Sequence, residues 1–563
     1  MSPQEVMARA RERLGDALLS AQELVPGKVY LEAKPEAVTR FASLCGPEIG
    51  GRYLVGFGTD LGNGRLRVSH VFSLDQDRIF VVGHFPVSEQ DPRIDSLTPL
   101  LPAASWAERE FRDLLGIEPV GHPDPRRLVV PDDWPADVYP LRKEVPYDYH
   151  PPAVVGQEQK LKEPPEGSSV LPIGPFYPVL EEPAQLRLYM DGERIVGCDY
   201  RGFYNHRGIE KMAEAVLTYN QIPFIAERIC GICGFIHSTC YCQTAEEALG
   251  IEAPPRANFI RTAVLELERV QSHLLWLGIA AHIVGFDTLL MQTWRIREPL
   301  MWLAERILGA RKTYGVNVVG GVRRDIPKES HEDILRVLAQ VEREMLAVVD
   351  ALPGDTSLTM RLKGVGVITP EVARAFAVVG PTARGSGLEV DARVDHPYAA
   401  YAEVPPNVAV QQEGDNYARV VVRLLETLDS IRMLREALKH MPDGPLVTEV
   451  TEDPRPGRQG VSTVEAPRGE AIHYLLTGGD NRPLRWRVRA PTYQHLQAVQ
   501  AIVPELTVAD VPITLGSLDP CFSCTERVEA VQVETGETRA YSEQELIALS
   551  RQKYGPDFPG AGT

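Results

Sequence analysis

Two Cys-x-x-Cys segments that lie far apart in the chain could together offer four thiolates to one metal ion. Cys230 and Cys233 form the first pair, and Cys521 and Cys524 form the second, with residues 234–520 between them. The chain contains only 8 cysteines, so half of them belong to these two pairs. Soft thiolates suit nickel, zinc, copper(I) and iron–sulfur clusters. The spacing therefore predicts a four-thiolate metal site that the fold closes.

Other uses of paired cysteines fit this chain less well. A zinc ribbon usually keeps its two pairs about 15–20 residues apart, so the wide separation argues against a small autonomous zinc module. A disulfide framework needs an oxidising compartment, and residues 1–5 do not begin the basic-then-apolar pattern of a signal peptide. A thioredoxin-type site needs only one pair. Buried or incidental thiols remain the alternative to a metal site.

The residues around both pairs resemble the large subunit of NiFe-hydrogenases. The pattern R-x-C-G-x-C-x-x-x-H occupies residues 228–237, and D-P-C-x-x-C occupies 519–524. Arg527 closes the second motif where many such enzymes have histidine, which is similar to the group 4, energy-converting branch. The segments 309–315 (GARKTYG) and 320–325 (GGVRRD) resemble in particular the large subunits of formate hydrogenlyase and hydrogenase-4. The resemblance extends over nearly the whole chain.

This resemblance implies a ligand set. Cys230, Cys233, Cys521 and Cys524 would bind nickel, and Cys233 and Cys524 would also bridge to an iron that carries carbon monoxide and cyanide. Soft, electron-rich donors suit an ion that changes its oxidation state, and coordination removes the thiol proton, whose ordinary pKa is about 8.5. His237 lies one helical turn after Cys233, and we interpret it as a hydrogen-bond donor to a thiolate rather than as a ligand.

Cleavage of hydrogen also needs a base for the proton and a path for the electrons. The candidate bases are the thiolate of Cys521 and Arg468, which matches the arginine that the family holds over the open metal position; Pro467 precedes it and is assigned to the cofactor site. An arginine is nearly always protonated, so Arg468 could instead polarise hydrogen or stabilise charge. Glu182 matches a carboxylate that relays the proton, although a proline follows it where many relatives have glycine. Glu210 matches a carboxylate that helps to hold a structural magnesium or second iron, or is an ordinary helix-start glutamate.

The core subunit of respiratory complex I is the second hypothesis. It shares the same scaffold, lacks the four cysteines and carries a His-Pro-x-x-His quinone loop. Residues 174–182 read GPFYPVLEE at that place, without either histidine. Both differences favour a hydrogenase over a quinone oxidoreductase. A non-catalytic scaffold whose cysteines hold zinc is the third hypothesis.

No cysteine-rich ferredoxin run is present, so we expect iron–sulfur clusters on partner subunits only. The resemblance implies an iron–sulfur small subunit, a ferredoxin-like subunit, complex I-like membrane subunits, a maturation endopeptidase and nickel-insertion factors. The net charge of −18 argues against nucleic acid as a partner. The longest apolar run, residues 274–286, is shorter than the roughly 18–20 residues that cross a bilayer. We therefore expect a cytoplasmic subunit that is peripheral on the inner membrane through its partners.

The chain divides by composition into four parts. Residues 1–150 are predicted to form an α+β domain, which resembles the small peripheral-arm subunit of complex I and would serve in docking and assembly. Residues 151–170 form a proline-rich linker, and 171–527 form a mainly α-helical bundle domain with small β elements, similar to NiFe-hydrogenase large subunits. The resemblance implies that residues 528–563 are a propeptide removed after Arg527.

Periodicity and turn chemistry predict the main elements. In the first domain we expect helices at 4–23 and 105–115, and strands at 52–59, 66–74 and 78–87, with a hairpin at Gly62-Asn63-Gly64. In the second domain we expect strands at 186–190 and 194–199, and long helices at 256–283, 288–308 and 417–441. These helices would form a bundle core that can hold a metal site between its segments.

Overall fold

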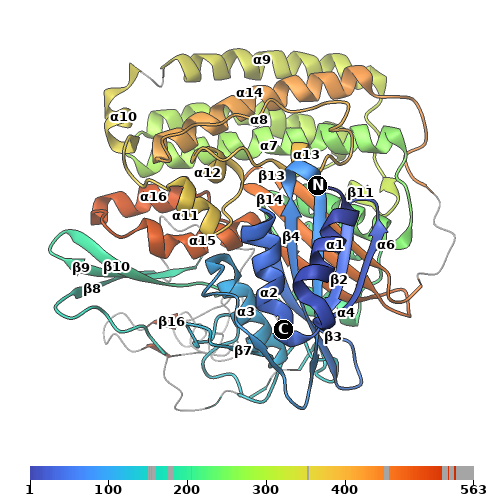
Figure 1. The fold of residues 1–563 in the computed structure, drawn as a ribbon. Coiled ribbons are helices and arrows are strands. Elements are labelled where there is room, and N and C mark those ends of the chain that lie inside the picture. Colours follow the sequence, from blue (N-terminus) through green and yellow to red (C-terminus); the bar gives the residue numbers. More distant parts are fainter. Residues whose placement is uncertain are drawn as a thin grey trace, which may run out of the picture.

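The computed structural model describes residues 1–149, 151–152, 154, 160–174, 183–204, 206–351, 354–448 and 455–522, and the short strands β16 (Ala530–Val531) and β17 (Thr538–Arg539). It is a mixture of helices and sheets, as predicted (Figure 1). Residues 542–553, whose apolar spacing also predicts a short helix, lie outside the described residues.

A five-stranded sheet organises the N-terminal part of the chain. Its order is β1-β2-β5-β4-β3, with β2 and β5 parallel and the other neighbours antiparallel. The strands are β1 (Leu18–Val25), β2 (Lys28–Ala33), β3 (Arg52–Asp60), β4 (Arg65–Leu74) and β5 (Ile79–Ser88). Gly62, Asn63 and Gly64 all adopt positive φ angles in the β3–β4 turn, which confirms the predicted hairpin.

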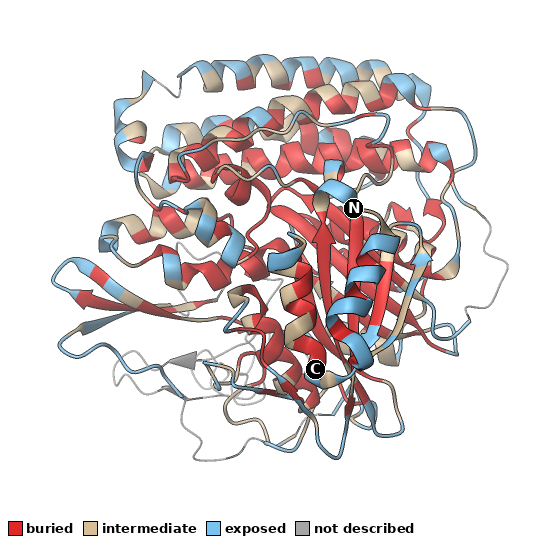
Figure 2. Cartoon of the chain, in the orientation of Figure 1, coloured by how far each residue is buried: buried red, intermediate tan, exposed pale blue. Residues whose placement is uncertain are grey.

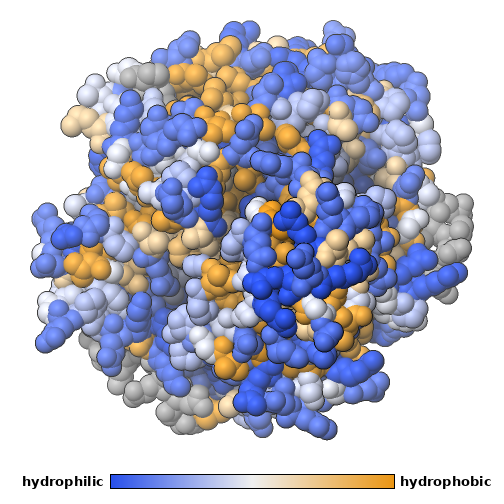
Figure 3. All heavy atoms as spheres, viewed as in Figure 1, coloured by the Kyte–Doolittle hydropathy of each residue, from blue (hydrophilic) through white to orange (hydrophobic). Residues whose placement is uncertain are grey.

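Helices cover one face of this sheet. They are α1 (Pro3–Leu14), α2 (Val38–Ser43) and α3 (Ser105–Leu115), of which α3 has the predicted bounds. The helix predicted at 4–23 was too long. Gly15, with a φ of 55°, ends α1, and residues 18–25 instead pair with β2, because strand pairing overrides a weak helix propensity. The outer surface of α1 is mainly hydrophilic (Figure 3).

The opposite face of the same sheet packs against a second sheet from the far end of the sequence. That sheet contains β13 (Gln459–Ala466), β14 (Gly469–Thr477) and β15 (Pro483–Arg489), which were not predicted. Phe57 of β3 stacks on Tyr474 of β14 with ring centroids 4.6 Å apart. Because both faces are covered, the strands β3–β5 are buried along most of their length (Figure 2). This explains why they read as continuous apolar runs.

Four long helices form the bundle at the top of Figure 1. They are α7 (Pro255–Ile283), α8 (Asp287–Leu308), α9 (His331–Ala351) and α14 (Asn416–His440); α7, α8 and α14 confirm their predictions within one residue at each end. The outer helix α9 was not predicted, and it exposes much of its surface (Figure 2). The bundle continues into one buried apolar cluster that includes Cys230, Cys233 and Cys521.

Shorter elements connect the bundle to the sheets. The helices are α4 (Ile209–Ala215), α5 (Ile222–Ala226), α6 (Gly234–Leu249), α10 (Thr356–Leu362), α11 (Pro370–Ala375), α12 (Gly380–Arg384), α13 (Ala392–Asp395), α15 (Pro491–Ile502) and α16 (Val511–Ser517). The small strands are β6 (Arg93–Asp95), β7 (Glu118–Val120), β8 (Ser169–Ile173), β9 (Gln185–Asp191), β10 (Arg194–Arg201), β11 (Asn317–Val318) and β12 (Gly321–Val322). β9 and β10 confirm the predicted strand pair, and Ser169 and Val170 of the predicted linker belong to β8.

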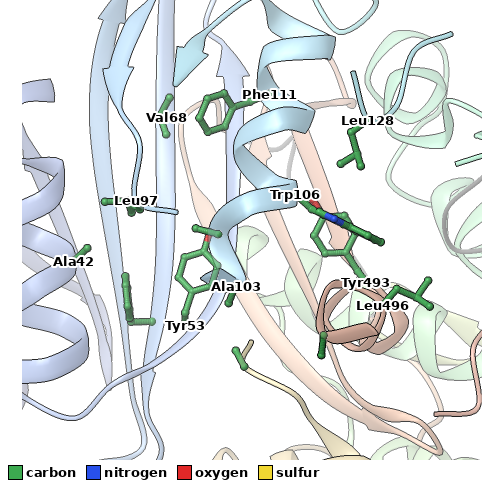
Figure 4. Close-up of a cluster of buried hydrophobic side chains, with 14 of the residues drawn as sticks. Ala42, Tyr53, Val68, Leu97, Ala103, Trp106, Phe111, Leu128, Tyr493 and Leu496 are labelled. Atoms are coloured by element: carbon green, nitrogen blue, oxygen red, sulfur yellow. The ribbon is translucent and has the colours of Figure 1, made fainter. Parts of the chain in front are cut away.

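The N-terminal sheet and the C-terminal half share one core. Trp106 of α3 packs edge-to-face on Tyr493 of α15 with centroids 5.4 Å apart. Figure 4 shows α3 between the N-terminal strands and α15, with Leu496 beside Tyr493. Residues 1–130 and 184–522 therefore contribute to a single buried apolar cluster.

None of the described helices combines the length and apolar character that crossing a bilayer requires.

Candidate metal centre

The fold brings Cys230 of the first pair and Cys521 of the second pair together. The sulfur atoms of Cys230 and Cys521 lie 3.2 Å apart, although 291 positions separate them in the sequence. Both residues and Cys233 are buried. Cys524 and Glu182 lie outside the described residues. One cysteine from each predicted pair thus meets the other in the interior, and Cys233 is buried in the same apolar cluster.

The start of α6 positions the first pair. Cys233 is the N-cap residue of this helix, and the Cys230 sulfur accepts backbone N–H groups from Ile232 at 3.4 Å and from Cys233 at 3.2 Å. These N–H groups and the positive end of the helix dipole favour a thiolate. Gly234 must lack a side chain, because a Cβ atom there would lie 2.2 Å from the ring of Tyr314.

The turn after α16 positions Cys521. Its backbone N–H donates to the hydroxyl of Thr492 on α15 at 3.1 Å. Asp519 precedes it with a φ of 54°, a left-handed conformation that is strained for a residue with a side chain. Such strain persists where the surroundings hold the residue firmly, and the partner of Asp519 is Arg468.

Arg468 and Pro467 form the two-residue loop of the β13–β14 hairpin, since Ala466 pairs with Gly469. The Arg468 side chain is only 3% exposed. Its Nε donates to the Asp519 carbonyl at 2.8 Å, its Nη2 lies 2.7 Å from the Asp519 carboxylate, and its Nη1 donates to Ser272 of α7 at 3.3 Å. The hairpin tip thus places a fixed guanidinium beside the thiols.

Charge at this position is also fixed. Burial alone would lower the pKa of Arg468, but the Asp519 carboxylate and the neighbouring thiolates raise it well above its ordinary value. Arg468 is therefore a permanent cation, suited to polarising a substrate or stabilising negative charge. This geometry favours that role over the role of a base.

The thiol of Cys233 holds its proton strongly. A hydrogen bond with the Cys230 thiol and burial raise the pKa of Cys233 well above its ordinary value, and the charge of Arg468 opposes the shift. A metal that binds to these cysteines must displace their thiol protons, so metal binding is coupled to proton release.

Sequence reasoning missed Glu268 of α7, which supports the first pair from behind. Its carboxylate accepts the backbone N–H groups of Phe235 at 3.1 Å and Ile236 at 3.2 Å, and the hydroxyl of Thr313 at 2.5 Å. These are N–H groups at the start of α6 that have no partner within the helix. Burial raises the pKa of Glu268 to about 8, and the Thr313 hydrogen bond opposes this shift. The only signal in the sequence was a glutamate directly after the mainly apolar residues 263–267.

Glu210 lies in the first turn of α4, away from the thiols. Its carboxylate pairs with Arg485 at 2.6 Å and Arg487 at 3.4 Å, and it accepts the backbone N–H of Val488 at 3.0 Å. Burial would raise the pKa of Glu210, but the two arginines lower it overall. Glu210 is thus an acidic residue in the first turn of a helix, as the alternative interpretation expects, and a metal at Glu210 stays a prediction.

His237 lies in the first turns of α6 and is fully buried. Its Nδ1 lies 3.2 Å from Nε2 of His473 on β14. Burial lowers the pKa of His237 to about 4, while the charge of Cys230 opposes the shift. The ring is therefore neutral and is a neighbour of the thiol cluster.

The donor set suits a soft metal ion. Two sulfurs that each lie about 2.3 Å from one ion are about 3.3 Å apart at a right angle and about 3.8 Å apart at a tetrahedral angle, so the observed 3.2 Å needs little adjustment. Across the described ranges, no three His, Cys, Asp or Glu side chains converge closely enough to form a complete metal site. The predicted fourth donor, Cys524, is not among them. Cys240 instead packs against β13, with its sulfur 3.3 Å from the Ser462 carbonyl.

Comparison with protein families assigns most of the chain to related groups. Residues 31–151 match the 30 kDa subunit of respiratory-chain NADH dehydrogenase, and 284–463 and 448–527 match its 49 kDa subunit. Residues 207–281, which include the first cysteine pair, match the nickel-dependent hydrogenases. A complex I-like scaffold with clustered thiols at its centre defines the large subunit of a nickel-dependent hydrogenase.

Two relatives from Escherichia coli (strain K12) align over almost the full length. Hydrogenase-4 component G is 39% identical, with 97% of each chain covered. Formate hydrogenlyase subunit 5 is 40% identical, with 96% of this chain and 99% of the relative covered. The chain belongs to the family of these energy-converting, group 4 NiFe-hydrogenase large subunits. It is an oxidoreductase that acts on hydrogen with a nickel–iron cofactor.

Among solved structures, the chain is similar to one from the membrane-bound sulfane sulfur reductase, an archaeal respiratory membrane complex. The TM-score is 0.60 at 30% sequence identity, over 64% of this chain and 98% of that chain. These relatives are subunits of larger assemblies. This chain is accordingly one subunit among partners.

Proposed function

We propose that Cys230, Cys233, Cys521 and Cys524 would hold nickel, and that Cys233 and Cys524 would also hold an iron with carbon monoxide and cyanide ligands. The contact between Cys230 and Cys521 beneath Arg468 carries this proposal. When bound, the group supplies the electrophile and the redox states that reversible oxidation of hydrogen and reduction of protons require. The complex I-like quinone oxidoreductase is the weaker alternative, because it would leave the thiol cluster without a use.

The chain's own residues then have distinct roles. Arg468 stabilises negative charge next to the thiols, held in place by Asp519 and Ser272. The Cys521 thiolate accepts the proton, and Glu182 passes it toward solvent. Pro467 shapes the hairpin tip that aims Arg468, and His237 donates a hydrogen bond to a thiolate. A magnesium or second iron near Glu210 would be structural.

Partners complete the path for electrons. The described cysteines other than Cys230, Cys233 and Cys521 are Cys45, Cys198, Cys240 and Cys242. They lie on three separate segments and do not form the closely spaced run that typically holds an iron–sulfur cluster. Electrons therefore pass to an iron–sulfur small subunit and a ferredoxin-like subunit, in an assembly with complex I-like membrane subunits. We place the chain on the cytoplasmic face of the inner membrane, held there by these partners.

The predicted parts of the chain have separate tasks in this proposal. Residues 1–150 form a domain that docks partner subunits. Residues 151–170 link this domain to the catalytic domain of residues 171–527, and residues 528–563 are removed. Nickel-insertion factors load the site, and a maturation endopeptidase then cleaves the chain.

Metal analysis of the purified complex tests the assignment. We expect nickel and iron in the wild-type protein and in Cys198→Ser, and loss of nickel in Cys230→Ser and Cys521→Ser. Cys198 is a matched control because it is equally buried but lies on β10. Zinc in place of nickel would indicate the scaffold hypothesis, and a metal-free active complex would indicate the quinone oxidoreductase.

A further inference from the structure

Three aromatic side chains form a buried hydrogen-bonded chain behind the first cysteine pair. His237 of α6 contacts His473 of β14 with 3.2 Å between its Nδ1 and the Nε2 of His473. His473 in turn contacts Trp486 of β15, whose Nε1 lies 3.3 Å from the Nδ1 of His473. All three side chains have no exposed surface. This series of hydrogen bonds therefore links the metal centre to the interior of the second sheet.

The hydrogen-bond chemistry of tryptophan sets the direction of this chain. The indole Nε1–H can only donate, so the Nδ1 of His473 must be an acceptor without a proton. A neutral imidazole carries its proton on the other nitrogen. The Nε2 of His473 therefore bears the hydrogen and donates to the Nδ1 of His237.

The same rule then fixes His237. Its Nδ1 accepts a hydrogen bond, so its proton sits on Nε2. The opposite arrangement would require His473 to accept at both nitrogens, which only an anionic ring could do. Burial lowers the pKa of His473 well below its ordinary value, and His237 adds to this shift, so a doubly protonated His473 is also excluded.

The Nε2–H of His237 is a hydrogen-bond donor that these contacts do not use. It is fully buried and has no hydrogen-bond partner within the part of the chain that the structure describes. A buried donor without an acceptor destabilises the fold, so this group implies a partner at the metal centre. Cys230 lies near enough for its charge to act on His237, and a thiolate sulfur can accept a hydrogen bond.

We propose that Trp486 and His473 are positioning residues that lock the tautomer and ring orientation of His237, so that its Nε2–H donates to a metal-binding thiolate. The inference rests on the proposed function, because the acceptor is one of the cysteine ligands. A thiolate that accepts a hydrogen bond gives less electron density to its metal. Loss of the donor makes the metal more electron-rich, which lowers the stretching frequencies of carbon monoxide and cyanide on the iron.

Infrared spectroscopy of the nickel-loaded complex tests the proposal. His473→Leu cannot donate to His237, so we expect its bands to shift to lower frequency with nickel content unchanged. His473→Gln is the matched control, since its amide can accept from Trp486 and donate to His237, and its bands should remain at the wild-type positions. Trp486→Phe keeps the ring and removes only the N–H, so it should give a smaller shift in the same direction.

A double-mutant cycle separates this role from simple packing. If His473 acts through His237, the variant His237→Leu/His473→Leu should show the same bands as His237→Leu alone. Additive shifts, or equal shifts in His473→Leu and His473→Gln, would overturn the proposal. If His473→Leu does not assemble, Trp486→Phe and His473→Gln supply the comparison, and wild-type bands in Trp486→Phe would then overturn it.

Different results would contradict the proposed function and the positioning role of His473. A wild-type complex without nickel or metal-bound carbon monoxide and cyanide contradicts the proposed function. A wild-type complex with these bands, and a His473→Leu variant with identical ones, contradicts the positioning role alone.

Discussion

The guanidinium of Arg468 holds Asp519 by two contacts, one to its carboxylate at 2.7 Å and one to its backbone carbonyl at 2.8 Å. Asp519 stands two residues before Cys521 and adopts a left-handed conformation. One side chain therefore ties the hairpin tip to the turn that carries the second cysteine pair. The same contact fixes the position of the cation beside the thiols.

Arg468→Lys tests the importance of this geometry. Lysine keeps the charge but not the planar fork that reaches both atoms of Asp519. We expect hydrogen turnover to fall by about 100-fold or more, the loss usual for one preorganised charged donor, with nickel content retained. The exposed Arg336 provides the control, since Arg336→Lys should leave turnover within about twofold of wild type. Full activity in Arg468→Lys would show that charge alone suffices.

Glu268→Gln tests the support behind the first cysteine pair. A glutamine can present only one oxygen, so one of the N–H groups of Phe235 and Ile236 loses its acceptor. We expect a loss of about 1–3 kcal/mol in the free energy of unfolding, measured by urea denaturation, and reduced retention of nickel during dialysis. Glu403→Gln on the surface should change neither quantity. Unchanged stability in Glu268→Gln would mean that α6 does not depend on this carboxylate.

Asp395 at the end of α13 predicts a pH dependence. Burial, and secondly the charge of Asp75, raise its pKa from 3.8 to about 8. Between these pH values the folded state binds more protons than the unfolded state, so this group makes the free energy of unfolding fall as pH rises. Asp395→Asn cannot titrate and should gain stability relative to wild type from about pH 4 to about pH 8, and no further above it.

The measurement is the urea midpoint of both proteins at intervals across that window. Asp350→Asn, at an exposed position, should run parallel to wild type throughout. A constant difference between Asp395→Asn and wild type would contradict the raised pKa.

Glu110→Gln tests the contact between the N-terminal sheet and the rest of the chain. Glu110 of α3 accepts from Arg487 of β15 at 2.8 Å and from the Tyr493 hydroxyl at 2.7 Å. Removing one partner of a buried ion pair leaves a charge without compensation, so we expect a loss of about 3 kcal/mol. Thermal unfolding of Glu110→Gln beside the exposed control Glu118→Gln measures it. Equal transition temperatures would show that Glu210 alone balances Arg487.

Maturation predicts a change in mass. If residues 528–563 are a propeptide, the active enzyme should end at Arg527, whereas a nickel-free precursor should retain the full length. Intact-mass spectrometry of the two forms distinguishes them. Active enzyme that still carries residues 528–563 would defeat this prediction.

Local signals predicted the elements that depend on neighbouring residues. The β3–β4 hairpin was predicted from Gly62-Asn63-Gly64, three residues that readily adopt the positive φ angles found there. Helices α7 and α14 were predicted from apolar periodicity. The two Cys-x-x-Cys segments predicted a common site because few residue types share their chemistry, and Cys230 and Cys521 do lie in contact.

Long-range contacts could not be predicted in this way. Glu268 meets the start of α6 only because α7 packs beside it, and a single buried glutamate has no spacing that marks it. His473 and Trp486 lie in a sheet whose strands pair only in the folded chain. The predicted N-terminal helix was too long because Gly15 ends the helix and the residues after it pair with β2.

The separation of 291 positions between Cys230 and Cys521 also determines the time that passes between the synthesis of the two thiols. A ribosome that adds about 5–20 residues per second needs about 15–60 s to travel from the first thiol to the second. During that interval the first cysteine pair has been synthesised without the second, so it can supply only two of the four predicted thiolate ligands. Loading of the complete centre must therefore wait until translation is nearly finished, which gives helper proteins a defined moment at which to act.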